Sequence, residues 1–221
     1  MRKTEFANGE YYHIYNRGVD KREVFLGEED YLRFLTSMRE FNRVDPIGSL
    51  YEKYLDEEKR GLSPHKGDLV PFATVPLVEI VCYCLNPNHY HLILKQLSEG
   101  GISKFMLKLS SGYSSYFNKK NKRSGSLFQG PFKSVHIDSN EYLLYLSAYV
   151  NKNNFIHGYN KNDNWPYSSL LDYLGERNGK LINKEIILGQ FKSADEYKEF
   201  LESNALYMRE KKELAGYLIE E

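Results

Sequence analysis

The stretch that decides the fold is Cys82-Tyr83-Cys84-Leu85-Asn86-Pro87-Asn88-His89-Tyr90-His91-Leu92-Ile93-Leu94. It consists of two apolar runs that meet at Asn-Pro-Asn, a combination that favours a tight turn, so the pattern predicts a β-hairpin. His89 and His91 are the first and third residues of the returning strand, and side chains two apart on a strand share one face. Two neighbouring imidazoles can hold one divalent ion through neutral ring nitrogens. The alternative is that one or both are ordinary half-buried histidines.

The composition indicates a globular protein with one sizeable core. The chain has 221 residues, of which 41% are hydrophobic and 14% aromatic, and this content argues against disorder. No apolar run approaches the roughly 20 residues of a membrane helix, and the N-terminus lacks the apolar segment of a signal peptide. We therefore expect a cytosolic protein without a membrane partner. The two cysteines, Cys82 and Cys84, share one predicted strand, which suits reduced, buried thiols better than a disulfide.

The charges cancel over the whole chain but are unevenly distributed. Thirty basic residues balance thirty acidic ones, yet residues 101–137 contain no Asp or Glu. The basic residues of this segment are Lys104, Lys108, Lys119, Lys120, Lys122, Arg123 and Lys133. A cationic strip beside a candidate metal site is the pattern expected for a protein that binds a phosphate backbone. The alternative is a solvated helix face.

The order of predicted elements indicates a ferredoxin-like α+β domain. Strand patterns alternate with helical patterns in the order strand, helix, strand, strand, helix, strand, and an extra helix follows. The expected strands are residues 11–17, 77–85, 89–95 and 132–137, and the expected helices are residues 28–41 and 101–120. The extra helix should start at the capping box formed by Asp138 and Glu141.

Two further segments lie outside this pattern. Residues 43–75 are interrupted by proline and glycine, so we interpret them as an insertion with one short helix at about 50–59. The catalytic domain is then expected to span residues 1–158, and a C-terminal helical extension residues 159–221.

The extension shows no recognisable chemistry, and we expect it to serve as a scaffold or a helical clamp. Trp165 to Ser169 predicts a packed turn. Two helices are expected after it, Asn183 to Phe191 and Ser193 to Ile219, and the second should be capped by Ser193 and Glu196.

The helix after Asp138 can supply further groups to an ion at the histidines. Tyr149 and Asn153 are four residues apart and therefore share a helical face. Asn153 can offer a carboxamide oxygen to the ion, and Tyr149 can hold a phenol beside whatever the ion polarises. A phenol with a free pKa near 10 is a poor nucleophile until a metal withdraws charge from the phosphate that it attacks. Since the chain has 19 tyrosines, ordinary packing is the alternative role for Tyr149.

Five separated motifs occur between about residues 10 and 175. They are Tyr12-His13-Ile14-Tyr15-Asn16-Arg17-Gly18, Asn86-Pro87-Asn88-His89-Tyr90-His91-Leu92, Gly125-Ser126-Leu127-Phe128-Gln129-Gly130 with Phe132-Lys133-Ser134, Glu141-Tyr142-Leu143 through Ala148-Tyr149-Val150, and Trp165-Pro166-Tyr167-Ser168-Ser169. In order and spacing they resemble the IS200-like Y1 transposases, and in particular the REP-associated tyrosine transposases.

The resemblance implies the HUH-endonuclease form of the ferredoxin-like sandwich, with an antiparallel sheet and helices on one face. It implies that His89, His91 and Asn153 bind Mg²⁺ or Mn²⁺ and that Tyr149 is the nucleophile. The implied reaction is cleavage of single-stranded DNA at a hairpin-flanked, palindromic site, which gives a 5′-phosphotyrosine and a free 3′-hydroxyl. That hydroxyl can attack a second phosphotyrosine and rejoin the strands. Such a protein would associate with the nucleoid, as a homodimer or a monomer.

The expected DNA contacts extend beyond the basic strip. Asn16 and Arg17 stand at the exit of the first predicted strand, where they contact a ligand or merely shape the turn. Gln129 lies in the glycine-containing loop that follows the basic helix. Together with the basic residues of 101–137, they complete the set expected to bind DNA.

Three residues depart from the resembled pattern. Asn86 stands where methionine is common, and we expect this change to affect hairpin packing alone. Pro131 replaces a common arginine and removes one DNA contact and one backbone donor. Asn154 follows Asn153 where proline is frequent, which leaves the position of the helix end open.

The same hairpin allows a structural zinc site instead. With a four-residue turn, the two cysteines pair with the two histidines, so that all four side chains share one face and can bind Zn²⁺. These residues are Cys82, Cys84, His89 and His91. With a turn one residue shorter, Tyr83 pairs with His91 and both thiols lie on the other face. A second alternative keeps the fold without the chemistry, as a non-catalytic protein that binds single-stranded hairpins through aromatic residues and lysines.

Overall fold

A computed structural model describes residues 5–59, 75–159 and 164–217. Its centre is an antiparallel sheet of four strands in the order β2-β3-β1-β4. The strands are β1 (Tyr11–Arg17), β2 (Val78–Asn86), β3 (His89–Gln96) and β4 (Lys133–Ile137). Each predicted strand is present, with both ends within one residue of the expected bounds.

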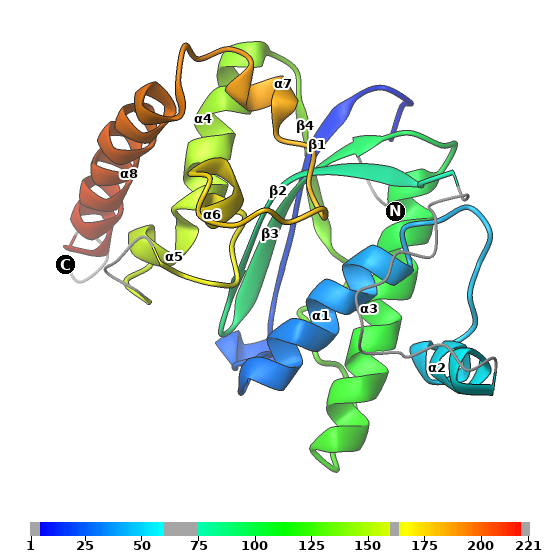
Figure 1. The fold of residues 1–221 in the computed structure, drawn as a ribbon. Coiled ribbons are helices and arrows are strands. Elements are labelled where there is room, and N and C mark those ends of the chain that lie inside the picture. The colour runs from blue at the N-terminus through cyan, green and yellow to red at the C-terminus, as the bar shows by residue number, and fades with distance from the viewer. Residues whose placement is uncertain (1–4, 60–74, 160–163, 218–221) are drawn as a thin grey trace.

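Helices cover both faces of the sheet (Figure 1). On one face lie α1 (Glu28–Glu40) and α3 (Gly101–Lys120), which complete the ferredoxin-like arrangement and confirm the predicted fold class. On the other face lies α4 (Asn140–Asn151), with α8 (Ala194–Tyr217) packed against its outer side. The extra helix and the extension that follow the ferredoxin-like unit form a further layer on this opposite face.

The alternation of side chains along β1 and β3 gives the two faces different characters. Tyr12, Ile14, Tyr90 and Leu92 point toward α1 and α3, where each is at most 1% exposed. We call this the aromatic face. Residues of the other parity, including His91, lie against α4, and we call that side the histidine face. Helix α3 packs through the predicted apolar stripe at helical spacing, in which Ile102, Phe105, Met106, Leu109, Tyr113 and Phe117 are buried.

The hairpin between β2 and β3 has a two-residue turn, Pro87 and Asn88. Asn86 therefore pairs with His89 across the strands, and Cys84 pairs with His91. This register differs from both registers considered for a zinc site, because the turn is shorter than either of them required. An irregularity between Ile80 and Cys82 then shifts the pairing further along β2.

The segment predicted as a packed turn lies along the outer edge of β2. The backbone N–H of Leu85 donates to the carbonyl of Tyr167 at 2.9 Å, and that of Ser169 donates to the carbonyl of Tyr83 at 2.9 Å. The indole of Trp165 donates to the carbonyl of Leu85 at 3.0 Å. The segment therefore satisfies polar groups of a strand edge that would otherwise be open to another chain.

Helix α8 holds α4 against the sheet, as expected of a clamp. The Tyr197 side chain is fully buried, and its hydroxyl accepts a hydrogen bond from Nδ2 of Asn151 at 2.9 Å. Oδ1 of Asn151 accepts a hydrogen bond from the hydroxyl of Ser169 at 2.5 Å. The same Ser169 hydroxyl accepts the N–H of Tyr83 in β2 at 2.9 Å. This chain of contacts fixes the helix that carries Tyr149.

The N-caps of α4 and α8 can be compared with the two capping boxes predicted from the sequence. Helix α4 is capped by Ser139, whose hydroxyl accepts the N–H of Tyr142, so the capping box predicted at Asp138 and Glu141 is wrong by one residue. The cap of α8 is confirmed, because the Ser193 hydroxyl accepts the N–H of Glu196 at 3.1 Å.

The remaining helices are short. They are η1 (Val19–Lys21), α2 (Leu50–Lys59), α5 (Asn153–Ile156), α6 (Leu170–Tyr173) and α7 (Glu185–Leu188). The helix predicted for Asn183 to Phe191 is reduced to α7, because the backbone N–H of Asn183 donates to Ile80 of β2 and its side chain caps Glu185. Parts of the predicted insertion (60–74) and of the last helix (218–219) lie outside the described residues. In the part of the chain that is described, no helix has the length and apolarity needed to cross a membrane.

Candidate active site

Strand β3 brings His89 and His91 together on the histidine face, as the sequence predicts. Their side chains are 5% and 7% exposed, and their rings lie 5.2 Å apart at an interplanar angle of 88°. Burial lowers the pKa of His89 to about 4 and holds the pKa of His91 well below its ordinary value. Both imidazoles are therefore neutral at neutral pH, which is the form that binds metal ions.

The surroundings of His89 fix its tautomer. Its Nδ1 lies 2.6 Å from Oδ1 of Asn88, and Tyr159 donates to the same oxygen at 2.9 Å. Nδ2 of Asn88 donates to the carbonyl of Lys21, so this amide presents its oxygen to the ring. An amide oxygen only accepts, and Nδ2 of Asn86 lies as a donor 3.1 Å from Nε2 of His89, so the proton of His89 is on Nδ1 and Nε2 is the accepting atom.

The predicted third ligand, Asn153, faces that atom. Its side chain is fully buried, and its Oδ1 lies 3.0 Å from Nε2 of His89. Asn153 is the first residue of α5, which follows a break after α4 at Lys152 (φ −101°, ψ 12°). The open question of the helix end is thus answered: Tyr149 and Asn153 lie on two successive helices that still direct both side chains to one site.

Tyr149, the predicted nucleophile, lies beside the histidines of its own chain. Its ring contacts His91 edge to face at a centroid distance of 5.3 Å and lies 6.2 Å from the ring of His13. Burial raises the pKa of the Tyr149 phenol. The predicted nucleophile therefore lies in a buried position beside one of the two predicted metal-binding histidines.

Two further histidines of the site have no role predicted from the sequence. Nε2 of His13 lies 2.8 Å from Nδ1 of His91, and burial lowers the pKa of His13 to about 4. The ring of His157 lies 4.8 Å from the ring of His89, and Lys212 donates to its Nδ1 at 2.9 Å. His13 could have been predicted, because it belongs to the same motif and strand as Arg17 and side chains at alternate positions of a strand share one face. No motif includes His157.

Two predicted DNA-binding residues border the site on the histidine face. Arg17 pairs with His89 across β1 and β3, and its positive charge adds to the lowering of the pKa of His89. Lys133 of β4 pairs with Tyr15, which in turn pairs with His91, and its Nζ lies 6.0 Å from the centre of the Tyr15 ring. Both cations can therefore meet a phosphate group near the histidines.

The basic strip on α3 does not lie beside the candidate metal site, which corrects that expectation. The apolar stripe of α3 packs on the aromatic face, because the residues there have the opposite parity to the histidines. Lys104 is exposed on this layer, and Lys108 donates to the carbonyl of Ile47. Contact of these two lysines with DNA stays a prediction.

The end of α3 and the following loop use several of their polar groups within the protein. Lys120 forms ion pairs with Glu29 and Asp30, and Arg123 donates to Asn118 and to the carbonyl of Ser126. The remaining members of the strip, Lys119 and Lys122, are exposed.

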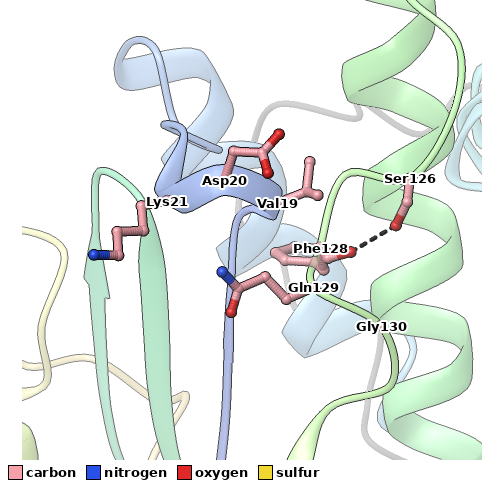
Figure 2. A pocket seen from close by; sticks show the side chains of 7 residues that line it. All are labelled: Val19, Asp20, Lys21, Ser126, Phe128, Gln129 and Gly130. Carbon is pink, nitrogen blue, oxygen red and sulfur yellow. Dashed lines mark hydrogen bonds between the residues drawn. The ribbon is translucent and has the colours of Figure 1, made fainter.

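An open pocket of about 570 Å³ lies between this loop and the end of β1 (Figure 2). Gln129 lines it and is exposed, whereas Asn16 is buried and donates to the carbonyl of Gly130 at 3.0 Å. The other lining residues are Val19, Asp20, Lys21, Ser126, Phe128 and Gly130. The pocket adjoins the hairpin turn, because Asn88 donates to the carbonyl of Lys21.

The structure does not support the zinc site. Cys82 pairs with Ile93 rather than with a histidine, and its thiol donates to the hydroxyl of Tyr173 at 3.3 Å. Burial raises the pKa of Cys82 and of Cys84 to about 12, so both remain thiols. Both are free and buried, as predicted. Within residues 5–59, 75–159 and 164–217, no group of three or more His, Cys, Asp and Glu side chains is placed to hold a metal ion.

Residues 73–153 match the family model described as transposase IS200 like. The resemblance to the IS200-like transposases is confirmed. The matched segment includes His89, His91, Tyr149 and Asn153. No curated protein matches the chain.

Among solved structures, the chain is similar to a REP-associated tyrosine transposase bound to a REP hairpin. The two share 15% sequence identity, with a TM-score of 0.53, and the alignment covers 83% of this chain and 93% of the other. At this identity the likeness shows a shared fold. It agrees with the open four-stranded sheet and its helices.

Proposed function

We propose that this chain is a metal-dependent transposase that cleaves and rejoins single-stranded DNA through a phosphotyrosine at Tyr149. The observation that carries the proposal is that Tyr149 and Asn153 converge on the two histidines. The Tyr149 ring contacts His91 at a centroid distance of 5.3 Å, and Oδ1 of Asn153 lies 3.0 Å from Nε2 of His89. The candidate nucleophile therefore lies beside the candidate metal site.

The residues present fit a divalent ion such as Mg²⁺ or Mn²⁺. His89 Nε2 and Asn153 Oδ1 lie 3.0 Å apart and both accept from Nδ2 of Asn86, so a cation that replaces these hydrogens can be shared by the two atoms. His91 adds an imidazole whose Nδ1 is held by His13, as ring nitrogens of metal-binding histidines usually are. When bound, the ion would act as a Lewis acid on the phosphate.

The chain supplies the other parts of the reaction. The Tyr149 oxygen attacks the phosphorus and loses its proton, and the bond from phosphorus to the 3′ oxygen breaks. The 3′ oxygen leaves and takes up a proton as a free hydroxyl, so that a 5′-phosphotyrosine remains. The reverse attack by a 3′-hydroxyl restores a phosphodiester and frees Tyr149, which explains rejoining without an external energy source.

The DNA partner is proposed to be a single strand next to a hairpin. The structural relative is a transposase bound to a REP hairpin. In this chain Arg17 and Lys133 can bind the backbone of the strand to be cut, next to the histidines. The exposed Lys119 and Lys122, and Gln129 at the pocket, can meet the neighbouring duplex.

The test is a labelled hairpin oligonucleotide incubated with the protein and Mg²⁺ or Mn²⁺. We expect a covalent adduct that survives denaturant, disappears in Tyr149→Phe and persists in Tyr145→Phe. Tyr145 lies one turn earlier on α4 and is 38% exposed, so it is a matched control. DNA binding should be retained in Tyr149→Phe. Binding without an adduct in the parent protein would favour the non-catalytic hairpin-binding function, and an adduct in Tyr149→Phe would exclude Tyr149 as nucleophile.

A further inference from the structure

Asn86 lies inside the candidate metal site rather than merely in the hairpin core. It is the last residue of β2, it pairs directly with His89, and its side chain is fully buried. Its Nδ2 donates to Oδ1 of Asn153 at 2.6 Å and lies 3.1 Å from Nε2 of His89. The expectation that Asn86 affects hairpin packing alone is therefore wrong, because the short turn brings its amide to the two ligand atoms.

The three atoms form a triangle with the dimensions of adjacent metal ligands. Its sides are 2.6 Å, 3.1 Å and, between His89 and Asn153, 3.0 Å. Around an octahedral ion with bonds of about 2.1 Å, neighbouring ligand atoms lie about 3.0 Å apart. The position of the Asn86 amide therefore fits that of a third ligand beside His89 and Asn153.

The amide can present an oxygen at this position by a half-turn about its last side-chain bond. At present its Oδ1 accepts the thiol of Cys84 at 3.7 Å. After the half-turn the amide nitrogen faces the sulfur, which is a weak hydrogen-bond acceptor. Both orientations of the amide thus have a partner.

We propose that Asn86 is a further ligand of the divalent ion through Oδ1, beside His89, His91 and Asn153. This inference rests on the proposed function, from which it takes the ion. Without the ion, the amide nitrogen of Asn86 donates to both lone pairs and keeps the two ligand atoms in place. With the ion, a second carboxamide oxygen shifts the donor set toward hard ions such as Mg²⁺ and Mn²⁺.

The test is Mn²⁺ binding to the full chain without DNA, measured by electron paramagnetic resonance of the free ion. The variants are Asn86→Leu, which removes the ligand at similar volume, and Asn86→Asp, which keeps an oxygen and adds a charge. We expect Asn86→Leu to weaken Mn²⁺ binding at least about tenfold and Asn86→Asp to tighten it. Thermal unfolding verifies that each variant is folded.

A control variant distinguishes failure of this inference from failure of the proposed function. His91→Ala should weaken Mn²⁺ binding whether or not Asn86 is a ligand. If His91→Ala weakens binding while Asn86→Leu binds as tightly as the parent or more tightly, the role of Asn86 is overturned and the metal site stands. The same holds if Asn86→Asp binds no more tightly than the parent. If neither His91→Ala nor Asn86→Leu changes Mn²⁺ binding, the metal site of the proposed function is itself excluded.

Discussion

The two faces of the sheet are built from the same strands and are buried to a similar degree, yet their buried side chains have different roles. On the aromatic face, Tyr90 and Leu92 pack among apolar rings and methyl groups, and their burial stabilises the fold. On the histidine face, His89 and His91 are almost as well buried, although burying a polar group costs free energy unless it is hydrogen-bonded. Each imidazole there has a polar partner. The comparison teaches that burial on one face stabilises the protein, whereas on the other it keeps ligands neutral and in place.

The strongest way to break the comparison is to change adjacent residues of β3 that point to opposite faces. His91→Ala should reduce covalent adduct formation below detection, because it removes a ligand. Leu92→Ala should instead lower the free energy of unfolding by about 2–5 kcal/mol and leave adduct formation per folded molecule near the parent level. Denaturant unfolding and an adduct assay on both variants check this. Equal losses of activity per folded molecule would show that the two faces are not separable.

A second prediction concerns the support of His91. His13→Phe keeps an aromatic ring in β1 but removes the partner of the Nδ1 atom of His91, so Mn²⁺ affinity should fall by about 10- to 100-fold. Ile14→Val, the next residue on the aromatic face, should cost about 0.5–1.5 kcal/mol of stability and leave Mn²⁺ affinity unchanged. Calorimetric titration with Mn²⁺ measures both. Unchanged affinity in His13→Phe would make His13 a packing residue.

A third prediction sharpens the comparison for DNA. Arg17→Ala and Lys133→Ala, on the histidine face, should weaken DNA binding whatever the DNA sequence. Each should also reduce the slope of log K against log salt concentration by about 0.7, the value for one lost phosphate contact with a single strand. Lys104→Ala and Lys108→Ala, on the layer of α3, should have smaller effects. Fluorescence anisotropy at several salt concentrations gives the slopes. If Lys104→Ala and Lys108→Ala weaken DNA binding more than Arg17→Ala and Lys133→Ala, the DNA lies on the α3 side. The basic strip would then bind the phosphate backbone as predicted from the sequence.

The smallest expected effect is the alkylation of the two thiols in the folded protein. Their reactivity measures how closely the histidine face is packed. Cys82 and Cys84 are fully buried and burial raises the pKa of each to about 12, so they should resist alkylation at pH 8 in the folded protein. Both should react once denaturant is added. Mass spectrometry after iodoacetamide treatment counts the modified thiols. Rapid labelling without denaturant would show that this face opens readily.

The sequence predicts the strands and the long helices because their signals are local. Alternation and aromatic content mark β1 and β3, and apolar spacing marks α1 and α3. The placement of His89 and His91 on one face of the same strand follows from their spacing. The positions of Tyr149 and Asn153 follow from spacing and from the resemblance. These predictions need no knowledge of what packs against what.

The remaining features depend on contacts between distant segments. The turn length at Asn-Pro-Asn decides whether Asn86 or another residue faces His89, and the sequence allows more than one length. Periodicity shows that α3 has an apolar side but not which face of the sheet it covers, so the expected position of Lys104 and Lys108 beside the histidines is wrong. The helix expected from Asn183 is shortened by a hydrogen bond to β2 that no local pattern encodes.

The network that joins Asn151, Ser169 and Tyr197 has a consequence for how copies of the protein cooperate. The helix of Tyr149 is enclosed between the sheet and α8, so an exchange of this helix between two molecules would break the network in both. One molecule should therefore carry out a complete nick with its own histidines and its own tyrosine. The rate per molecule should then stay constant as the protein solution is diluted.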